Sequence, residues 1–98
     1  MSYDLQKSSR QNKKYSIKTP DEKIIHFGAR GYEDFVTHKD PERKERYIAR
    51  HKSREDWTKK GIGSAGFFSR WLLWNEPTLE SSIKDVEKKF GIKILNKI

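Results

Sequence analysis

The sequence has no cysteine, a single methionine, three prolines and no long apolar run. Without cysteine the chain has no disulfide, thiolate metal site or cysteine nucleophile, which is typical of a reducing compartment. No stretch approaches the ~20 apolar residues of a membrane helix, and the N-terminus lacks a signal-peptide core. We therefore expect a soluble protein with no membrane partner, in the cytosol, the nucleus or a particle.

Apolar and acidic residues are both scarce. Only 33% of the 98 residues are hydrophobic and 37% are charged, and 22 basic residues against 14 acidic ones give a net charge of +8. A chain of this size buries only ~60–65% of its unfolded surface, so we expect one small domain and a homodimer. A domain this basic is attracted to polyanions.

Residues 64–77 carry the densest group of aromatic and apolar side chains. At helical spacing Phe67, Trp71 and Trp74 share one face, and Leu73 widens the apolar stripe. Such a helix is buried on several sides and is predicted to form the core. The residues assigned to the core or the dimer interface are Phe67, Phe68, Trp71, Leu72, Trp74, Leu79, Ile83, Val86 and Phe90.

The N-terminal third is predicted to form a flexible basic arm followed by a β-hairpin. Residues 1–12 are polar and show no periodicity. Residues 13–28 alternate apolar and polar side chains on both sides of a proline-containing turn at 19–22. Residues 32–36 fit a third short strand or a turn of helix. The side chains predicted to face inward are Tyr15, Ile17, Ile25, Phe27, Tyr32, Phe35 and Val36.

The C-terminal third is predicted to be helical. Thr78 is a good N-cap, apolar residues recur along 79–90 at helical spacing, and Gly91 is a good stop. Residues 92–95 fit a strand beside the hairpin. The fold class is therefore α+β: a single domain over 13–98 in which the hairpin packs on about three helices.

A basic helix is predicted to begin at Asp40-Pro41 and to run to about residue 54. At 100° per residue, four arginines fall within about 80° of one another on one face. The one clean i,i+4 partner within this helix is Glu42, for Arg46. The row consists of Arg43, Arg46, Arg50 and Arg54, and nearby lysines that widen it are Lys39, Lys44, Lys52, Lys59 and Lys60.

This arginine row has two interpretations. As a nucleic-acid surface it contacts phosphates, which arginine binds in a bidentate manner. Otherwise it is a solvated helix face, or it pairs with carboxylates across an interface. The carboxylates considered for such pairing are Glu76, Glu80, Asp85 and Glu87.

The other sequence motifs do not indicate a catalytic, metal or cofactor site. Residues 61–66 spell G-x-G-x-x-G, but no buried strand precedes them, so a flexible connector is expected rather than a dinucleotide site. A weaker alternative is that Lys59, Lys60 and the amides of 63–66 hold one phosphate. The three histidines lack metal-site spacing. No nucleophile or acid–base couple is recognisable, so we expect no catalytic residue, no metal, no cofactor and no enzyme activity.

Three stretches carry a resemblance: KIIHFG at 23–28, HKDPERKERYIARHK at 38–52 and GFFSRWLLWNEPTL at 66–79. Over residues 13–90 the chain resembles a small domain of unknown function from giant nucleocytoplasmic DNA viruses, also found in some algae and protists. The short basic form of marseillevirus-type viruses is the most similar. The resemblance implies a virion protein, in the host cytoplasm or nucleus during infection, and no reaction. We expect it to bind nucleic acid, DNA rather than RNA, without sequence specificity; the alternative is a structural component of the particle that binds an acidic virion protein.

Overall fold

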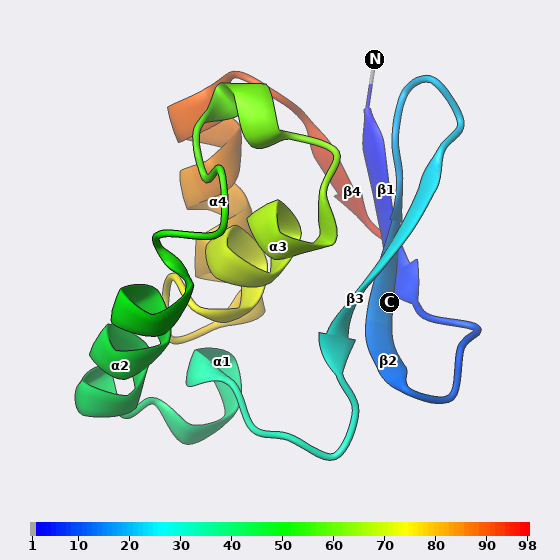
Figure 1. Ribbon diagram of the computed structural model, residues 1–98. Coiled ribbons are helices and arrows are strands. Elements are labelled where there is room, and N and C mark those ends of the chain that lie inside the picture. Colours follow the sequence, from blue (N-terminus) through cyan, green and yellow to red (C-terminus); the bar gives the residue numbers. More distant parts are fainter. Residues whose placement is uncertain (1) are drawn as a thin grey trace.

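The structure is a computed structural model that describes residues 2–98, and it contains a four-stranded sheet with helices packed on one face (Figure 1). The strands are β1 (Tyr3–Lys7), β2 (Lys13–Lys18), β3 (Ile24–Ala29) and β4 (Ile94–Asn96), in the spatial order β3-β2-β1-β4. The α+β class and the N-terminal strands are as predicted from the sequence.

The predicted hairpin is formed by β2 and β3. The two strands pair antiparallel, with Tyr15 opposite Phe27 and Ile17 opposite Ile25. The turn is closed by the backbone N–H of Glu22, which donates to the carbonyl of Thr19 at 2.9 Å. Because side chains alternate along a strand, these pairs share the face that the helices cover.

Part of the range predicted as a flexible arm, residues 1–12, forms the strand β1 instead; the first residue of that range lies outside the described residues. β1 pairs antiparallel with β2 and parallel with β4, and the side chain of Leu5 is fully buried. The predicted C-terminal strand therefore forms, but beside β1 rather than beside the hairpin. In this segment only Tyr3 and Leu5 alternate with polar residues, so the strand pattern is too short to be recognised from the sequence alone.

The helices are α1 (Phe35–His38), α2 (Pro41–His51), the 3-10 turn η1 (Lys59–Gly61), α3 (Ala65–Phe68), the π-helix η2 (Ser69–Leu73) and α4 (Leu79–Phe90). Asp40 and Thr78 accept backbone N–H groups as predicted N-caps, Ser64 does the same for α3, and Gly91 ends α4 with a φ of 65°. α2 ends at His51, three residues before the predicted end of the basic helix at residue 54.

Residues 32–36 do not form a strand: the last two begin the short helix α1, and the first three form the irregular segment before it. Phe35 is buried and Val36 is partly buried, in line with the expectation that both approach the core. Tyr32 is 75% exposed, so the prediction that it faces inward is wrong. It lies before α1 begins, in the turn that follows β3.

The aromatic stretch is not one regular α-helix. After α3 the chain widens into η2, where the N–H of Trp74 donates to the carbonyl of Ser69 at 3.1 Å, an i→i+5 bond. This wider turn breaks the expected stripe of Phe67, Trp71 and Trp74. Phe67 enters the core, Trp71 packs edge-on against Phe90, and Trp74 turns toward α2.

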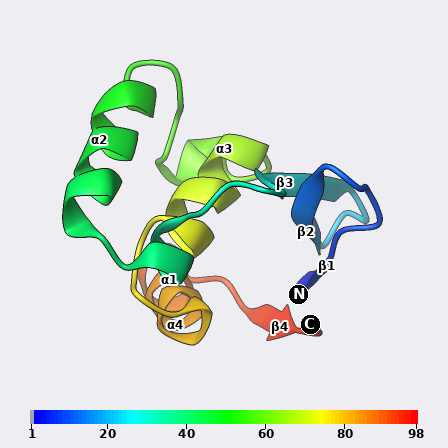
Figure 2. The ribbon, with the colours of Figure 1, turned by 90° about the horizontal axis from the view of Figure 1, so that it is seen from below.

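The core lies between the covered face of the sheet and the layer formed by α3, η2 and α4. Phe68 joins the two, with its ring centroid 6.0 Å from that of Phe27. Of the predicted core, six residues are buried and Trp71, Trp74 and Leu79 are partly buried against it. α2 lies on the far side of this helical layer from the sheet (Figure 2).

The homodimer stays a prediction. It was expected to use apolar surface left over on the aromatic helix and on α4. Within residues 2–98, the large apolar side chains that are exposed lie elsewhere: Ile24, Tyr32, Leu95 and Ile98. In the same residues no helix has the length and apolar character needed to cross a bilayer.

Candidate nucleic-acid interface

The arginine row begins on α2 and continues into the turn beyond it. Asp40 caps the helix by accepting from the N–H of Glu42 at 3.0 Å, and Pro41 occupies the first turn. Arg43 is partly buried, whereas Arg46 and Arg50 are exposed. Arg54 is exposed too, but it follows the end of the helix, so only the first three members share a helical face.

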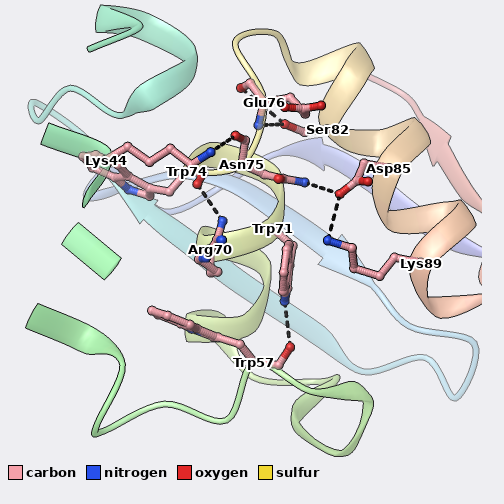
Figure 3. A network of polar contacts seen from close by, with 10 residues as sticks. All are labelled: Lys44, Trp57, Arg70, Trp71, Trp74, Asn75, Glu76, Ser82, Asp85 and Lys89. Atoms are coloured by element: carbon pink, nitrogen blue, oxygen red, sulfur yellow. Dashed lines mark hydrogen bonds and ion pairs between the residues drawn. The ribbon is translucent and has the colours of Figure 1, made fainter. Parts of the chain in front are cut away.

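α2 is attached to the body of the protein chiefly through one ring. Tyr47 is its only buried residue, and it stacks on Trp74 with centroids 4.3 Å apart and planes 2° from parallel. A second attachment of α2 comes from Lys44, which donates its Nζ to the carbonyl of Asn75 at 2.6 Å (Figure 3). Lys44 therefore helps to anchor the helix, and its assignment to the phosphate-binding patch stays a prediction.

The three arginines on α2 line an open cleft of about 660 Å³, here called the arginine cleft. α3 lies between α2 and β3 (Figures 1 and 2), and small side chains from this region line the cleft. Small side chains at the exposed positions leave the cleft open, whereas the space beside the two glycines is already taken by Leu73 and Glu55. The small lining residues are Gly28, Ala29, Ala65, Gly66 and Ser69.

The far side of the arginine cleft contains groups that the sequence did not assign to the site. Lys13 and Lys14 come from β2, and Tyr32 comes from the turn after β3. These residues lie far from the arginine row in sequence. No spacing within the chain could have placed them opposite α2, because tertiary packing brings them there.

Two of the cations in the cleft have carboxylate partners. Lys14 forms a 2.7 Å ion pair with the buried Asp34, and Arg43 lies 3.4 Å from the exposed Glu33. Within residues 2–98, no carboxylate oxygen lies within 4.0 Å of the guanidinium of Arg46, Arg50 or Arg54.

The carboxylates that the sequence offered as alternative partners do not neutralise the row within this chain. Asp85 instead accepts from Asn75 at 2.7 Å and pairs with Lys89 at 3.4 Å (Figure 3). The Asn75 hydrogen bond lowers the pKa of Asp85 most, and Lys89 and Arg70 lower it further. Glu87 accepts from the N–H of Ile94 at 2.9 Å. The clean match expected between Glu42 and Arg46 is also missing from the ion pairs of residues 2–98.

The third acidic group that lines the arginine cleft, after Glu33 and Asp34, is Glu55. Its carboxylate lies against Gly66, where any Cβ would overlap it. Burial, and secondarily the charge of Glu55, raise the pKa of Tyr47 to about 12. A carboxylate at the start of α3 opposes an anion there, so the alternative phosphate site at 63–66 gains no support.

The remaining lysines of the predicted patch are scattered. Lys39 donates its Nζ to the carbonyl of Val36 at 2.6 Å, just before α2. Lys52 is exposed at the end of α2, and Lys59 and Lys60 are exposed in η1. None of these four lines the arginine cleft.

A second group of cations and aromatic rings packs against itself, so its ring faces are covered and do not bind a ligand. The guanidinium of Arg70 lies 4.3 Å from the ring of Trp71 and 5.5 Å from that of Trp57, and donates to the carbonyl of Trp74 at 2.7 Å (Figure 3). Lys89 also lies over Trp71, 4.2 Å from its ring. Base stacking on Trp71 is therefore blocked by the protein's own cations.

The described residues offer no metal centre: in residues 2–98 no three histidine, aspartate or glutamate side chains come together to hold an ion.

Comparison with known proteins adds a family. The model of a family of unknown function, DUF5754, matches residues 3–51, which runs from β1 to the last residue of α2. The matched half thus includes the hairpin and the three helical arginines. Neither a curated protein nor a solved structure matches the chain. The chain belongs to the family of unknown function DUF5754.

Proposed function

We propose that this protein is a non-enzymatic nucleic-acid-binding protein that contacts phosphates through the arginine row. The observation that carries the proposal is that Arg46, Arg50 and Arg54 lack carboxylate partners within residues 2–98, and that the first two of them line an open cleft. The net charge of +8 adds a general attraction to polyanions.

The chemistry of arginine favours a phosphate ligand. Its planar guanidinium matches two phosphate oxygens and is weakly hydrated, so it gives up water at low cost. Long basic side chains on an exposed helix face position a backbone, whereas sequence is read at base edges. We therefore expect binding without sequence specificity, and DNA is the nucleic acid proposed.

The test is a fluorescence anisotropy titration of a labelled oligonucleotide at several salt concentrations. If about six phosphates are neutralised on duplex DNA, log K falls with log salt at a slope of roughly −5. The triple variant Arg46→Glu/Arg50→Glu/Arg54→Glu is expected to weaken binding at least tenfold at 50 mM salt. Unchanged affinity in this variant would refute the proposal.

A matched control separates the arginine row from net charge. Lys84, Lys88 and Lys93 are exposed on α4 and in the segment after it, and their replacement by glutamate changes the net charge by the same amount. We expect a loss of less than threefold. An equal loss in both triple variants would mean that total charge, not the row, drives binding.

The competing role is that of a structural component that uses the same arginines on an acidic protein. In that case duplex DNA fails to bind at physiological salt, while a polyglutamate peptide binds and competes with the partner. The viral origin, the virion location and the homodimer remain predictions that this experiment does not address.

A further inference from the structure

We propose that the arginine cleft binds a single strand of nucleic acid, with one base stacked on Tyr32. The inference rests on the proposed function and deepens it, because it names the form of nucleic acid and the place where a base is held.

Tyr32 is unlike the other aromatic residues of the chain. Of the twelve phenylalanine, tyrosine and tryptophan side chains, all of them within the described residues, it is the only one that is mostly exposed, at 75%. It also takes part in none of the ring pairs found within residues 2–98, whereas Tyr47, Trp57, Trp71 and Trp74 are all in such pairs or beside cations.

The position of Tyr32 suits a stacking surface. It follows Gly31, whose φ of 93° is a conformation that glycine adopts without strain. This turn projects from the end of β3, and Tyr32 lines the cleft together with Arg43 and Arg46. Exposed rings beside a basic groove are the usual arrangement for binding single strands, because every base has a face that stacks.

The positive charges of the cleft suit the phosphates of a nucleic-acid backbone. Arg46 and Arg50 lie one helical turn apart on α2, and Lys13 lines the cleft from β2. Asp34 and Glu33 are matched by Lys14 and Arg43, which leaves Glu55 as the unmatched carboxylate among the lining residues. Glu55 follows the C-terminal end of α2, whereas Glu33 contacts Arg43 near the N-terminal end. The phosphates are therefore expected near Tyr32 and Arg46.

The shape of the cleft favours a single strand over a duplex. A volume of about 660 Å³ lies within the range of ~300–1,000 Å³ that holds small ligands, so it accommodates a nucleotide-sized segment. In a duplex the base faces are stacked inside the helix and unavailable to Tyr32. A duplex would contact only the arginines at the rim.

The experiment compares a labelled oligo(dT), an oligo(U) of equal length and a duplex of equal length by anisotropy at 50 and 150 mM salt. We expect both single strands, or one of them, to bind at least fivefold more tightly than the duplex. Tyr32→Ala should weaken single-strand binding about tenfold, because base stacking on an aromatic ring contributes this much or more. Tyr32→Phe should keep the affinity, and the duplex should not respond to either change.

Two further variants test the placement. Ala65→Phe puts a ring into the cleft from an exposed position and should weaken single-strand binding while sparing duplex binding. Ile24→Ala removes an exposed apolar side chain of β3 that does not line the cleft, and should change neither. Circular dichroism checks that each variant is folded.

The outcomes separate this inference from the proposed function. If the duplex binds at least as well as the single strands and Tyr32→Ala has no effect, the inference is refuted, while phosphate binding by the arginine row stands. If neither form binds, both proposals fail.

Discussion

α2 and α4 have similar local signals and different roles. They contain 11 and 12 residues, and each begins at a side-chain N-cap, Asp40 for α2 and Thr78 for α4. Yet α2 buries only Tyr47, whereas α4 buries Ser82, Ile83, Val86 and Phe90. The comparison teaches that helix-forming signals do not determine how much of a helix joins the core.

The difference follows from composition. α4 offers apolar side chains at helical spacing over its whole length, so one face packs on η2 and the sheet. α2 has arginine, lysine or glutamate at six of its 11 positions, and its short apolar arc is reached mainly by the ring of Trp74. α4 therefore stabilises the fold, while α2 presents cations to solvent.

The largest expected effect is the loss of a ring from α4. Phe90 is buried and packs against Phe67, with centroids 5.0 Å apart. Phe90→Ala should lower the free energy of unfolding by about 3–5 kcal/mol, through lost burial and a residual cavity. Ile48→Ala on α2 should cost less than about 1 kcal/mol, because that side chain is already partly exposed. Urea unfolding of both variants measures their losses in free energy of unfolding, and equal losses would refute the difference proposed between α4 and α2.

The second-largest loss of stability is expected at Tyr47, whose ring anchors α2. Tyr47→Ala should cost about 2–3 kcal/mol, because it removes a buried ring and its stacking on Trp74. Tyr47→Phe keeps both and should be nearly neutral at pH 7. Because the folded pKa of Tyr47 is raised to about 12, its contribution is complete below pH 10 and declines as the pH rises through 12. Tyr47→Phe and Tyr47→Ala both lack the phenol, so both should show a shallower alkaline decline than the unmodified chain in denaturant titrations between pH 8 and 12.

A smaller effect concerns the polar network of α4. Asp85→Asn should cost about 1 kcal/mol at pH 7, because the carboxylate accepts from Asn75 and pairs with Lys89. The pKa of Asp85 is lowered by folding, so its contribution is present above the unfolded pKa and is lost as the pH falls through the folded value. Thermal melts between pH 2 and 7 should show a shallower acid decline in Asp85→Asn. An unchanged acid limb would contradict this role.

The smallest effect is expected at the ion pair of α2. The side chains of Arg43 and Glu33 are 40% and 56% exposed, so solvent screens their attraction. A double-mutant cycle with Arg43→Ala and Glu33→Ala should give a coupling of about 0.2–1 kcal/mol at low salt. The coupling should vanish at 1 M salt. A larger, salt-resistant coupling would mean that α2 is held more firmly than the comparison implies.

Local signals in the sequence predicted much of the fold. The turn at 19–22, the N-caps of α2 and α4 and the stop at Gly91 all depend on neighbouring residues, and the structure has each of them. β1 was missed because its pairing with β4 joins residues about 90 positions apart. η2 was missed because a π-turn has no distinctive composition and arises from packing.

The site was predicted only in part. The periodicity of α2 correctly placed three arginines on one face, but it gave Lys44 to the same patch, although that side chain turns to Asn75. Tyr32 was assigned to the core because a tyrosine between glycine and acidic residues carries no sign of its exposure. The opposing lysines of β2 required the tertiary fold.

The π-turn of η2 has a consequence for sequence change. An α-helix advances by 100° per residue, and a π-turn uses one residue more to make nearly the same rotation. Deletion of one residue between 69 and 73 would therefore restore ordinary winding and leave the chain after it close to its present orientation, so that Trp74 keeps its place over Tyr47. Relatives that are one residue shorter at this point should hold their basic helix at a similar angle and keep its ligand preference.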